Sequence, residues 1–255
     1  MTEFELTINP NNLTKKLNTL RLLGNHGLSS ISLTNKANDD DLISISGNIW
    51  AKLPTTHITF TYSIKQHYGG GKAQAIQQFQ TFQKLLLGQP HSDYQILLVS
   101  GSQKRSLDTL SLLPSVTTSV AVAYNPFLSG ADLDTENHRL KQKLSFEIVQ
   151  RVYIQIGVDE QIIEKSINYI RNLRPDIAIS ICVMYPNQRL LQNWSFRPWH
   201  GVFLSKQYLE NLSFAQMYAQ KIIQKCLQEW QVDTLISWFE DDEKLRKWLQ
   251  WFLLI

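Results

Sequence analysis

Apolar and polar residues follow two alternating patterns along the chain. Short runs rich in β-branched and aromatic residues, such as residues 56–62, are typical of strands. Residues 95–99 form a continuous apolar run, which is the pattern of a strand covered on both faces. Between such runs, apolar residues recur at helical spacing, as Leu13, Leu17 and Leu20 do. The pattern therefore predicts strands that alternate with helices.

The predicted elements repeat one strand–helix unit from end to end. Strands are expected at residues 4–8, 30–34, 56–62, 95–99, 118–124, 151–156, 176–184 and 232–238. Helices are expected at residues 13–23, 39–53 and 72–87, in a short segment that ends near Pro114, and at residues 135–148, 160–173, 209–230 and 240–254. Residues 185–206 depart from this rhythm and predict a longer loop or a short helix over one mouth of the domain.

This order of elements predicts the fold class. Eight strands that alternate with eight helices in about 250 residues match a single (β/α)8 TIM barrel domain that spans residues 1–255. An open doubly wound sheet is the alternative, because both folds are built from βαβ units. No GxGxxG motif follows the first strand, which favours the barrel.

Composition narrows the class of protein. With 43% hydrophobic and 18% charged residues, the chain is expected to be globular. The net charge is +3 and no Lys/Arg run forms a basic footprint, so no nucleic-acid partner is expected. The longest apolar runs have about eight residues, against the roughly 20 that a membrane helix needs, so no membrane partner is expected. Two cysteines in apolar segments and no visible signal peptide predict a reducing, cytoplasmic location.

Candidate ligand-binding residues follow from the barrel prediction, because active sites of such barrels lie at the carboxyl ends of the strands. The helix at 135–148 adds three charged candidates, Glu136, Arg139 and Lys143. The polar residues that the pattern assigns to the strand ends are Glu5, Thr7, Thr34, Asn35, His57, Thr59, Ser100, Ser102, Tyr124, Gln155, Ser237 and Glu240. Such groups suit a polar ligand with a phosphate, a ribose or an amide-rich ring. No HxH, HExxH or CxxC spacing is present, so no metal site is expected, and no GxSxG marks a nucleophile.

Several of these residues also have structural explanations. A single histidine on a strand, such as His57, is more often packed and hydrogen-bonded than a ligand. Glu136, Arg139 and Lys143 share one helix face, which is usually a salt-bridged solvent face. Gln155 in an apolar strand needs either a hydrogen-bond network or a ligand, because a buried amide without partners is costly.

Two aromatic clusters and one glycine run remain. The cluster at residues 194–199 is expected either to cover an aromatic ligand or to cap the end of the barrel. Trp248, Trp251 and Phe252 share one face of the last helix. Both clusters are candidates for a protein interface, and a homo-oligomer is one hypothesis. Residues 69–71 are expected to form a flexible loop and not a phosphate cradle, since no Lys-Ser/Thr follows them.

The central part of the chain resembles a known enzyme family. Ala123-Tyr124-Asn125-Pro126, Leu140-Lys141-Gln142-Lys143-Leu144 and Tyr153-Ile154-Gln155 with Asp159 resemble the central run of methylenetetrahydrofolate reductases. Thr56-His57-Ile58-Thr59 and Ser32-Leu33-Thr34-Asn35 are similar to two earlier strands of that family, and Phe203-Leu204-Ser205-Lys206 is similar to the segment before its last strand. The order and spacing of these segments fit over nearly the whole chain.

The resemblance implies a (β/α)8 barrel that binds FAD at its carboxyl-end mouth and passes hydride from NADH or NADPH through the flavin to a folate. It implies that the flavin nucleotide is faced by Thr34, His57, Tyr124, Glu136, Arg139 and Lys143. Gln155 would contact the folate pterin, and Glu5 would supply the proton. The implied function is an oxidoreductase of one-carbon metabolism that reduces methylenetetrahydrofolate.

The chain also departs from the pattern of this family. Val99-Ser100-Gly101-Ser102 stands where the family has Leu-Arg-Gly-Asp, and Glu136 and Arg139 stand where it has Asp and Asn. No arginine near Trp238 matches the one that follows the family's last strand. These departures are compatible with an enzyme that works without a flavin. They also leave open a second hypothesis, a catalytically silent folate- or nucleotide-binding barrel that acts through a partner protein.

Overall fold

The predicted strands are present and close into a barrel. The computed structural model describes residues 1–6, 8, 11–34, 39–64, 71–89, 93–100, 108–199, 201–239 and 242–252. Its strands are β1 (Thr2–Leu6), β2 (Ser30–Thr34), β3 (His57–Ser63), β4 (Tyr94–Val99), β5 (Val120–Tyr124), β6 (Val149–Ile154), β7 (Ala178–Tyr185) and β8 (Asp233–Trp238). Each strand pairs in parallel with the next, and β8 pairs in parallel with β1. The (β/α)8 prediction is confirmed, and the open-sheet alternative is wrong.

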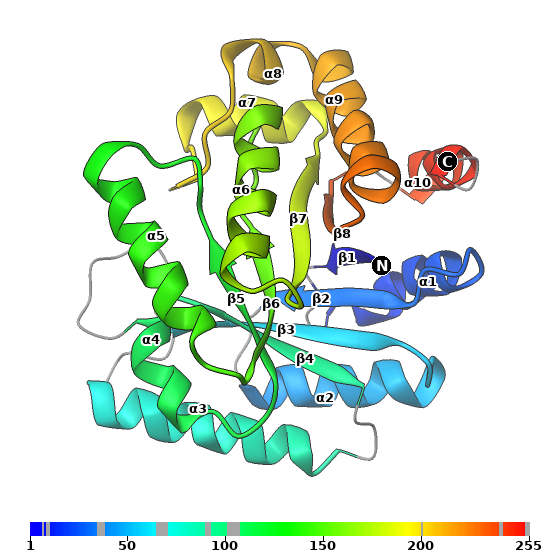
Figure 1. Ribbon diagram of the computed structural model, residues 1–255. Coiled ribbons are helices and arrows are strands. Elements are labelled where there is room, and N and C mark those ends of the chain that lie inside the picture. The colour runs from blue at the N-terminus through cyan, green and yellow to red at the C-terminus, as the bar shows by residue number, and fades with distance from the viewer. Residues whose placement is uncertain are drawn as a thin grey trace.

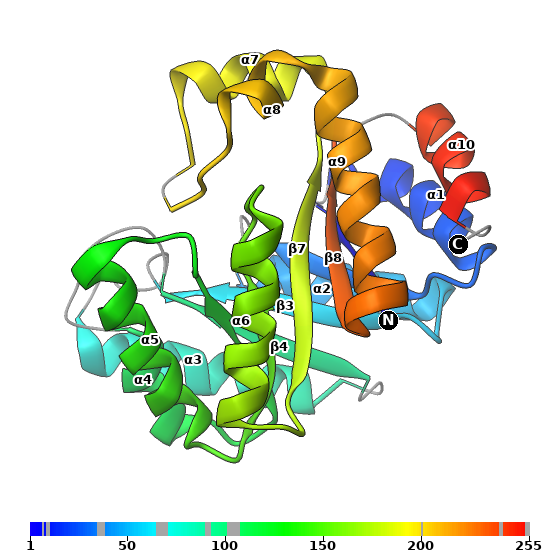
Figure 2. The ribbon, with the colours of Figure 1, turned by 45° about the horizontal axis from the view of Figure 1, so that its top comes forward.

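Helices follow the strands and form an outer layer around the barrel (Figure 1). They are α1 (Leu13–Gly24), α2 (Asp39–Lys52), α3 (Lys72–Leu87), α4 (Thr109–Leu112), α5 (Gly130–Leu144), α6 (Glu160–Leu173), α7 (Gln188–Phe196), α8 (Lys206–Glu210), α9 (Leu212–Lys225) and α10 (Asp242–Phe252). Two short turns, η2 (Leu113–Ser115) and η3 (Cys226–Trp230), extend α4 and α9. Figure 2 shows α7 and α8 standing beyond the end of β7.

Three predicted segments differ from the structure. The segment at 185–206, expected to be a longer loop or a short helix, holds the helix α7 and the first residue of α8. The helix expected at 135–148 begins at Gly130, because Gly130 adopts a positive φ of 54° at the turn and Asp132 then lies in the first turn, where the helix dipole favours a negative charge. The strand expected at 151–156 ends at Ile154, where its pairing with Tyr124 of β5 ends.

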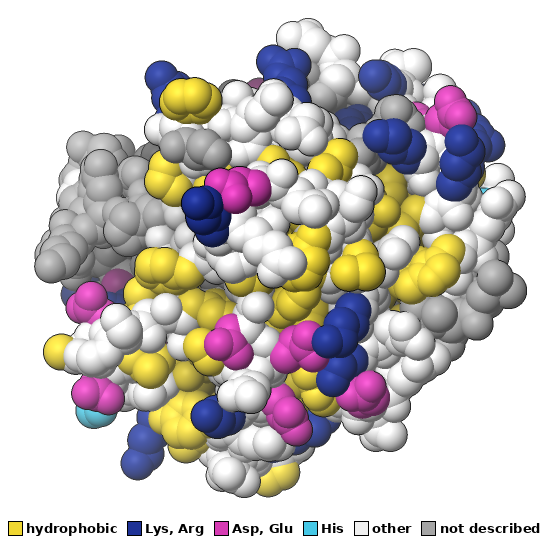
Figure 3. All heavy atoms as spheres, turned by 90° about the horizontal axis from the view of Figure 1, so that it is seen from above, with side chains coloured by type: hydrophobic (Ala, Val, Ile, Leu, Met, Phe, Trp, Pro, Cys, Tyr) yellow, Lys and Arg dark blue, Asp and Glu magenta, His cyan; other side chains and the backbone are white. Residues whose placement is uncertain are grey.

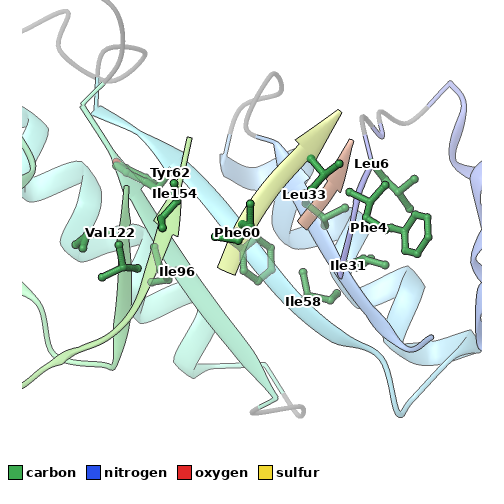
Figure 4. Close-up of a cluster of buried hydrophobic side chains, with 14 of the residues drawn as sticks. Phe4, Leu6, Ile31, Leu33, Ile58, Phe60, Tyr62, Ile96, Val122 and Ile154 are labelled. Atoms are coloured by element: carbon green, nitrogen blue, oxygen red, sulfur yellow. The ribbon is translucent and has the colours of Figure 1, made fainter. Parts of the chain in front are cut away.

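Apolar side chains on the outward faces of the strands form the main core. They alternate with inward-facing residues because successive side chains of a strand point to opposite faces. Figure 4 shows this outward set on six of the strands, namely Phe4, Leu6, Ile31, Leu33, Ile58, Phe60, Tyr62, Ile96, Val122 and Ile154. The helices cover them, so the strongest packing of this barrel lies between sheet and helices and not inside the barrel.

The surface mixes both signs of charge. Seen from above, basic and acidic side chains are interspersed, and hydrophobic side chains are visible between them (Figure 3). Among the described residues, no helix combines the length and the apolar character that crossing a membrane requires.

Phe60 provides a test of the outer core. Its fully buried ring makes edge contacts with Trp50, Phe82 and Tyr94 at centroid distances of 6.3, 5.8 and 6.3 Å. We expect Phe60→Ala to lower the free energy of unfolding by about 3–5 kcal/mol, because it removes an aromatic side chain and leaves a cavity. Urea unfolding followed by circular dichroism measures this loss.

The same truncation on the surface is the control. Phe196 is 85% exposed, so Phe196→Ala should change the free energy of unfolding by less than about 0.5 kcal/mol. Equal losses for the two variants would contradict the assignment of Phe60 to the core.

Candidate functional site

The inner face of this barrel is unusually polar. Strand register aligns Glu3 with Ser30 and Glu5 with Ser32, and these positions alternate with the outward-facing Phe4. The inward set also includes Thr34, Thr59, Thr61, Arg151, Tyr153, Ser180, Asp233 and Ser237. Barrels of this class are usually filled by branched apolar side chains. A polar filling costs stability unless its groups are hydrogen-bonded, so this inner face is a candidate site.

Glu3 is the most deeply buried carboxyl of the inner face, at 2% exposure. Its Oε2 accepts a hydrogen bond of 2.6 Å from the Tyr153 hydroxyl, which lies 3.5 Å from Thr59 Oγ1. Its Oε1 has no partner among the described residues. Burial raises the pKa of the Glu3 carboxyl, while the nearby Thr59 hydroxyl, the hydrogen bond from Tyr153 and the charges of His57 and Arg151 oppose that rise.

Glu3 was not among the residues that the sequence singled out. The signal for it was the alternation Thr2-Glu3-Phe4-Glu5-Leu6, which puts both carboxylates on one face of a strand. Below Glu3, Arg151 forms an ion pair with Asp233 and donates a hydrogen bond of 2.7 Å to Ser180 Oγ. Strands β6, β7 and β8 are therefore joined across the inside of the barrel by polar contacts.

Three predicted residues lie at the carboxyl end of the barrel. Glu5 is aligned with Ser237 of β8 and accepts a hydrogen bond from its hydroxyl. Thr34 ends β2, and its buried Oγ1 has no partner in the described part of the chain. Gln155 follows β6 directly; its Oε1 accepts a hydrogen bond of 2.9 Å from the Ile156 N–H. The structure therefore brings Glu5, Thr34 and Gln155 to one mouth.

Glu136, Arg139 and Lys143 do share one face of α5, but that face is turned toward the barrel. Lys143 is 4% exposed, and its Nζ donates a hydrogen bond of 2.9 Å to the Ala123 carbonyl and lies 3.6 Å from Glu136 Oε1. Arg139 pairs with Asp108 at 2.8 Å. Burial lowers the pKa of Lys143, and the Glu136 carboxylate opposes that shift. The solvent-face explanation is wrong for Lys143. Asp108 belongs to the same group of ion pairs, and the sequence did not reveal it.

Neither Tyr124 nor His57 lines the inner face of the mouth: Tyr124 is the last residue of β5, at the carboxyl end, but it points outward. Tyr124 has the same strand parity as Val122, so its ring faces the helices; its hydroxyl donates a hydrogen bond of 2.7 Å to Asn137 Oδ1. His57 was grouped with the carboxyl ends of the strands, but it is the first residue of β3 and lies at the opposite end of the barrel. Its Nδ1 lies 2.6 Å from Asp93 Oδ1, so it is hydrogen-bonded to the chain itself.

The segment between β7 and α9, which contains α7 and α8 and is named the excursion, forms one side of the mouth. Asn125 Nδ2 donates a hydrogen bond of 2.7 Å to the Gly201 carbonyl, and Gly157 makes a parallel bridge with Phe203. A side chain at position 157 would overlap the ring of Phe127, so only glycine fits there. These contacts hold the excursion to the ends of β5 and β6.

The tryptophan cluster of this excursion has two parts. Trp194 is buried, whereas Trp199 is 40% exposed and its ring lies 4.7 Å from Trp194 and 5.9 Å from Phe239. The cluster thus caps the barrel beside β8 and also presents an aromatic surface to solvent.

Some predicted positions lie outside the described residues, namely Thr7, Asn35, Gly69, Gly70, Ser102 and Glu240. Among the residues that are described, no three His, Cys, Asp or Glu side chains gather where they could hold a metal ion. Asp159, one of the residues behind the family resemblance, caps α6 by accepting hydrogen bonds from the N–H groups of Gln161 and Ile162.

Glu3 makes the stability of the fold depend on pH. Above the ordinary carboxyl pKa and below the raised one, the folded protein keeps the Glu3 proton that the unfolded chain has released. The contribution of Glu3 to stability therefore falls as pH rises through this range. We expect Glu3→Gln to remove this part of the decrease of the free energy of unfolding with pH. Urea unfolding at several pH values between about pH 5 and pH 8 measures the decrease.

The matched control is Glu210→Gln. Glu210 is 64% exposed and pairs with Lys206 at 3.7 Å on the surface of α8. Its variant should follow the pH profile of the wild type. Parallel profiles for wild type and Glu3→Gln would show that Glu3 is ionised in the fold like an ordinary surface carboxyl.

Comparison with known proteins identifies the fold but not a family. No protein-family model matches the sequence, and no curated protein matches it. Solved structures do match, and one of them aligns over 98% of this chain and 92% of its own chain, with a TM-score of 0.69 and 9% sequence identity. It is described as an uncharacterized protein from Clostridium thermocellum that binds two copies of 5-methyl-5,6,7,8-tetrahydrofolic acid. At this identity the likeness shows a shared barrel fold.

Proposed function

We propose that this chain binds a reduced folate of the 5-methyltetrahydrofolate type at the carboxyl end of its barrel. The observation that carries the proposal is the group of polar side chains, Glu5, Thr34 and Gln155, at the mouth of an inner face lined by further hydroxyls. A solved protein of the same fold binds such a folate, which supports the choice of ligand. The resemblance of residues 123–159 to a folate enzyme family supports it independently.

The chemistry of these side chains suits a pterin. The amino–oxo edge of a pterin presents N–H donors and a carbonyl acceptor in one plane. A carboxylate such as Glu5 can accept two such N–H groups, whereas the Gln155 amide can both donate and accept. A site built to satisfy these groups discriminates strongly against rings that lack them, because its own buried polar groups would be left unpaired.

The finer hypothesis is an enzyme, a divergent methylenetetrahydrofolate reductase-like oxidoreductase that uses NADH or NADPH. Glu5 is the candidate general acid, because it lies on the first strand at the mouth and within hydrogen-bonding reach of Ser237. A general acid must lie within hydrogen-bonding distance of the atom that it protonates. The folate site proposed above would place the pterin next to Glu5.

A flavin is the least supported part of that hypothesis. Of the residues assigned to it by resemblance, Tyr124 faces the helix layer, Lys143 binds a strand carbonyl, and His57 lies at the opposite end of the barrel. These residues do not fit FAD at the mouth. The same observation favours the second candidate function, a folate-binding barrel without catalysis that acts through a partner.

Binding of 5-methyltetrahydrofolate tests the proposal directly. We expect saturable binding in isothermal titration calorimetry, and Glu5→Gln should weaken it by about 10- to 150-fold, because a hydrogen bond to a charged group contributes about 1.5–3 kcal/mol. Glu210→Gln, on the surface of α8, should bind like the wild type. No saturable binding to the wild type would reject the proposed function.

An activity assay separates the enzyme from the silent barrel. Purified protein is supplied with methylenetetrahydrofolate and either NADH or NADPH, and oxidation of the nicotinamide is followed by its absorbance. If the chain is the proposed reductase, Glu5→Gln should slow turnover by about 10²–10⁴-fold, the usual contribution of a general acid. Folate binding without turnover would support the silent barrel, and a flavin absorbance spectrum of the purified protein would restore the FAD hypothesis.

A further inference from the structure

A groove lies outside the barrel between α9 and α10. Its volume is about 280 Å³, and its floor is formed by Trp248 and Trp251 of α10 and by Tyr185 at the end of β7. Tyr185 belongs to the outward-facing core, so the groove is separated by the strand layer from the mouth residues Glu5 and Gln155. Figure 1 shows α9 and α10 as neighbours on this side of the molecule.

The aromatic floor of the groove is held in place by ring–ring packing. Trp248 is 3% exposed and stacks on Phe252 at 4.9 Å, and Tyr185 stacks on Trp238 at 4.4 Å with an interplanar angle of 13°. Trp251 is half-buried and contacts Trp248 at 5.7 Å, so part of its ring remains open to the groove. An aromatic surface held in place by such packing loses little entropy when a second ring stacks on it.

The walls of the groove supply amides and positive charge. Gln216 and Gln220 line it from α9. Lys244, Lys247, Trp248 and Trp251 fall at i, i+3, i+4 and i+7 on α10, so one helix face presents both lysines beside both tryptophans. Among the described residues, the two charged ones that line the groove are both lysines.

The two acidic residues that the structure describes in the first turn of α10 leave the groove accessible to an anion. Asp242 accepts a hydrogen bond of 3.0 Å from the Thr19 hydroxyl and so faces α1. Glu243 pairs with Lys247 at 3.1 Å, but both side chains are more than 70% exposed. An ion pair this exposed contributes little, so a ligand carboxylate can replace Glu243 as the partner of Lys247.

We propose that this groove is a second ligand site, for a small planar aromatic carboxylate. The ring would stack on Trp251, the carboxylate would pair with Lys244 and Lys247, and the amide of Gln220 would bind a polar substituent on the ring. The amide of Gln216 donates a hydrogen bond of 2.9 Å to the Pro186 carbonyl and forms part of the groove wall. A volume of about 280 Å³ is at the lower end of small-molecule sites, which fits a ligand of one or two rings. This site is independent of the folate site proposed for the mouth.

Naphthoate is the probe for this site. We expect saturable one-to-one binding in isothermal titration calorimetry with the full chain, and much weaker binding of the neutral analogue naphthamide. The double variant Lys244→Ala/Lys247→Ala should weaken naphthoate binding at least about tenfold, the effect of losing a charge-assisted hydrogen bond. Trp251→Ala should weaken both probes, because it removes the stacking surface.

Lys206→Ala is the matched control, because Lys206 is also an exposed lysine with a glutamate partner one helical turn away. It should bind naphthoate like the wild type, and thermal melts should show that every variant remains folded. Excess 5-methyltetrahydrofolate should leave naphthoate binding unchanged; displacement would assign the probe to the mouth and overturn the proposal.

Three further results would overturn the proposal. One is the absence of saturable naphthoate binding to the wild type. Another is equal affinity in the wild type and the double-lysine variant. The third combines two observations: naphthoate does not bind, and analytical ultracentrifugation shows a concentration-dependent dimer of the wild type that the double-lysine variant does not form. In that case the groove would be covered by a second copy of the chain.

Discussion

The alternation of side chains along eight paired strands is the constraint on which the rest of this structure depends. Closure of β8 onto β1 leaves every strand with one face toward the helices and one face toward the barrel axis. Phe4 and Phe60 belong to the first face, and Glu3 and Thr59 to the second. A shift of register by one residue would exchange these faces and place the carboxyl of Glu3 in the apolar layer. Burial of the apolar side chains on the outer face therefore fixes the strand register, and with it which polar side chains point into the barrel.

That inner layer has two regions with different chemistry. Deep in the barrel, Glu3, Tyr153 and Thr59 bind one another, and Arg151 pairs with Asp233. Burial disfavours the charged form of Glu3 and raises the pKa of its carboxyl. Toward the mouth, Thr34 Oγ1 has no partner among the described residues, and Gln155 Oε1 accepts one hydrogen bond from the Ile156 N–H. Unpaired polar atoms such as Glu3 Oε1 also lie deep in the barrel, but the mouth is where the inner face opens at the strand ends, which is why the proposed folate site lies there.

The charged helix α5 illustrates how a ligand-type pattern can serve the fold. Lys143 reaches the strand carbonyl of Ala123, and Arg139 reaches Asp108 before α4. These contacts join α5 to β5 and to the segment after β4, beside the mouth. Residues that resemble a flavin site in sequence are here engaged with the chain itself. Their part in the proposed function is to hold the end of β5, and with it Asn125 and the excursion that Asn125 binds through Gly201.

The sequence by itself determined the strand and helix order, the barrel and the polar character of the strand ends, because period-two and helical patterns are local properties. It could also have identified Glu3, which alternates with Phe4 and Leu6 in a five-residue strand. It could not assign Tyr124 to the helix layer, Lys143 to a strand carbonyl or His57 to the far end of the barrel. Those assignments depend on the residue at which each strand begins and on which face of the strand points into the barrel. Both are decided only by contacts between residues more than a hundred positions apart, such as Glu3 with Tyr153 and Glu5 with Ser237.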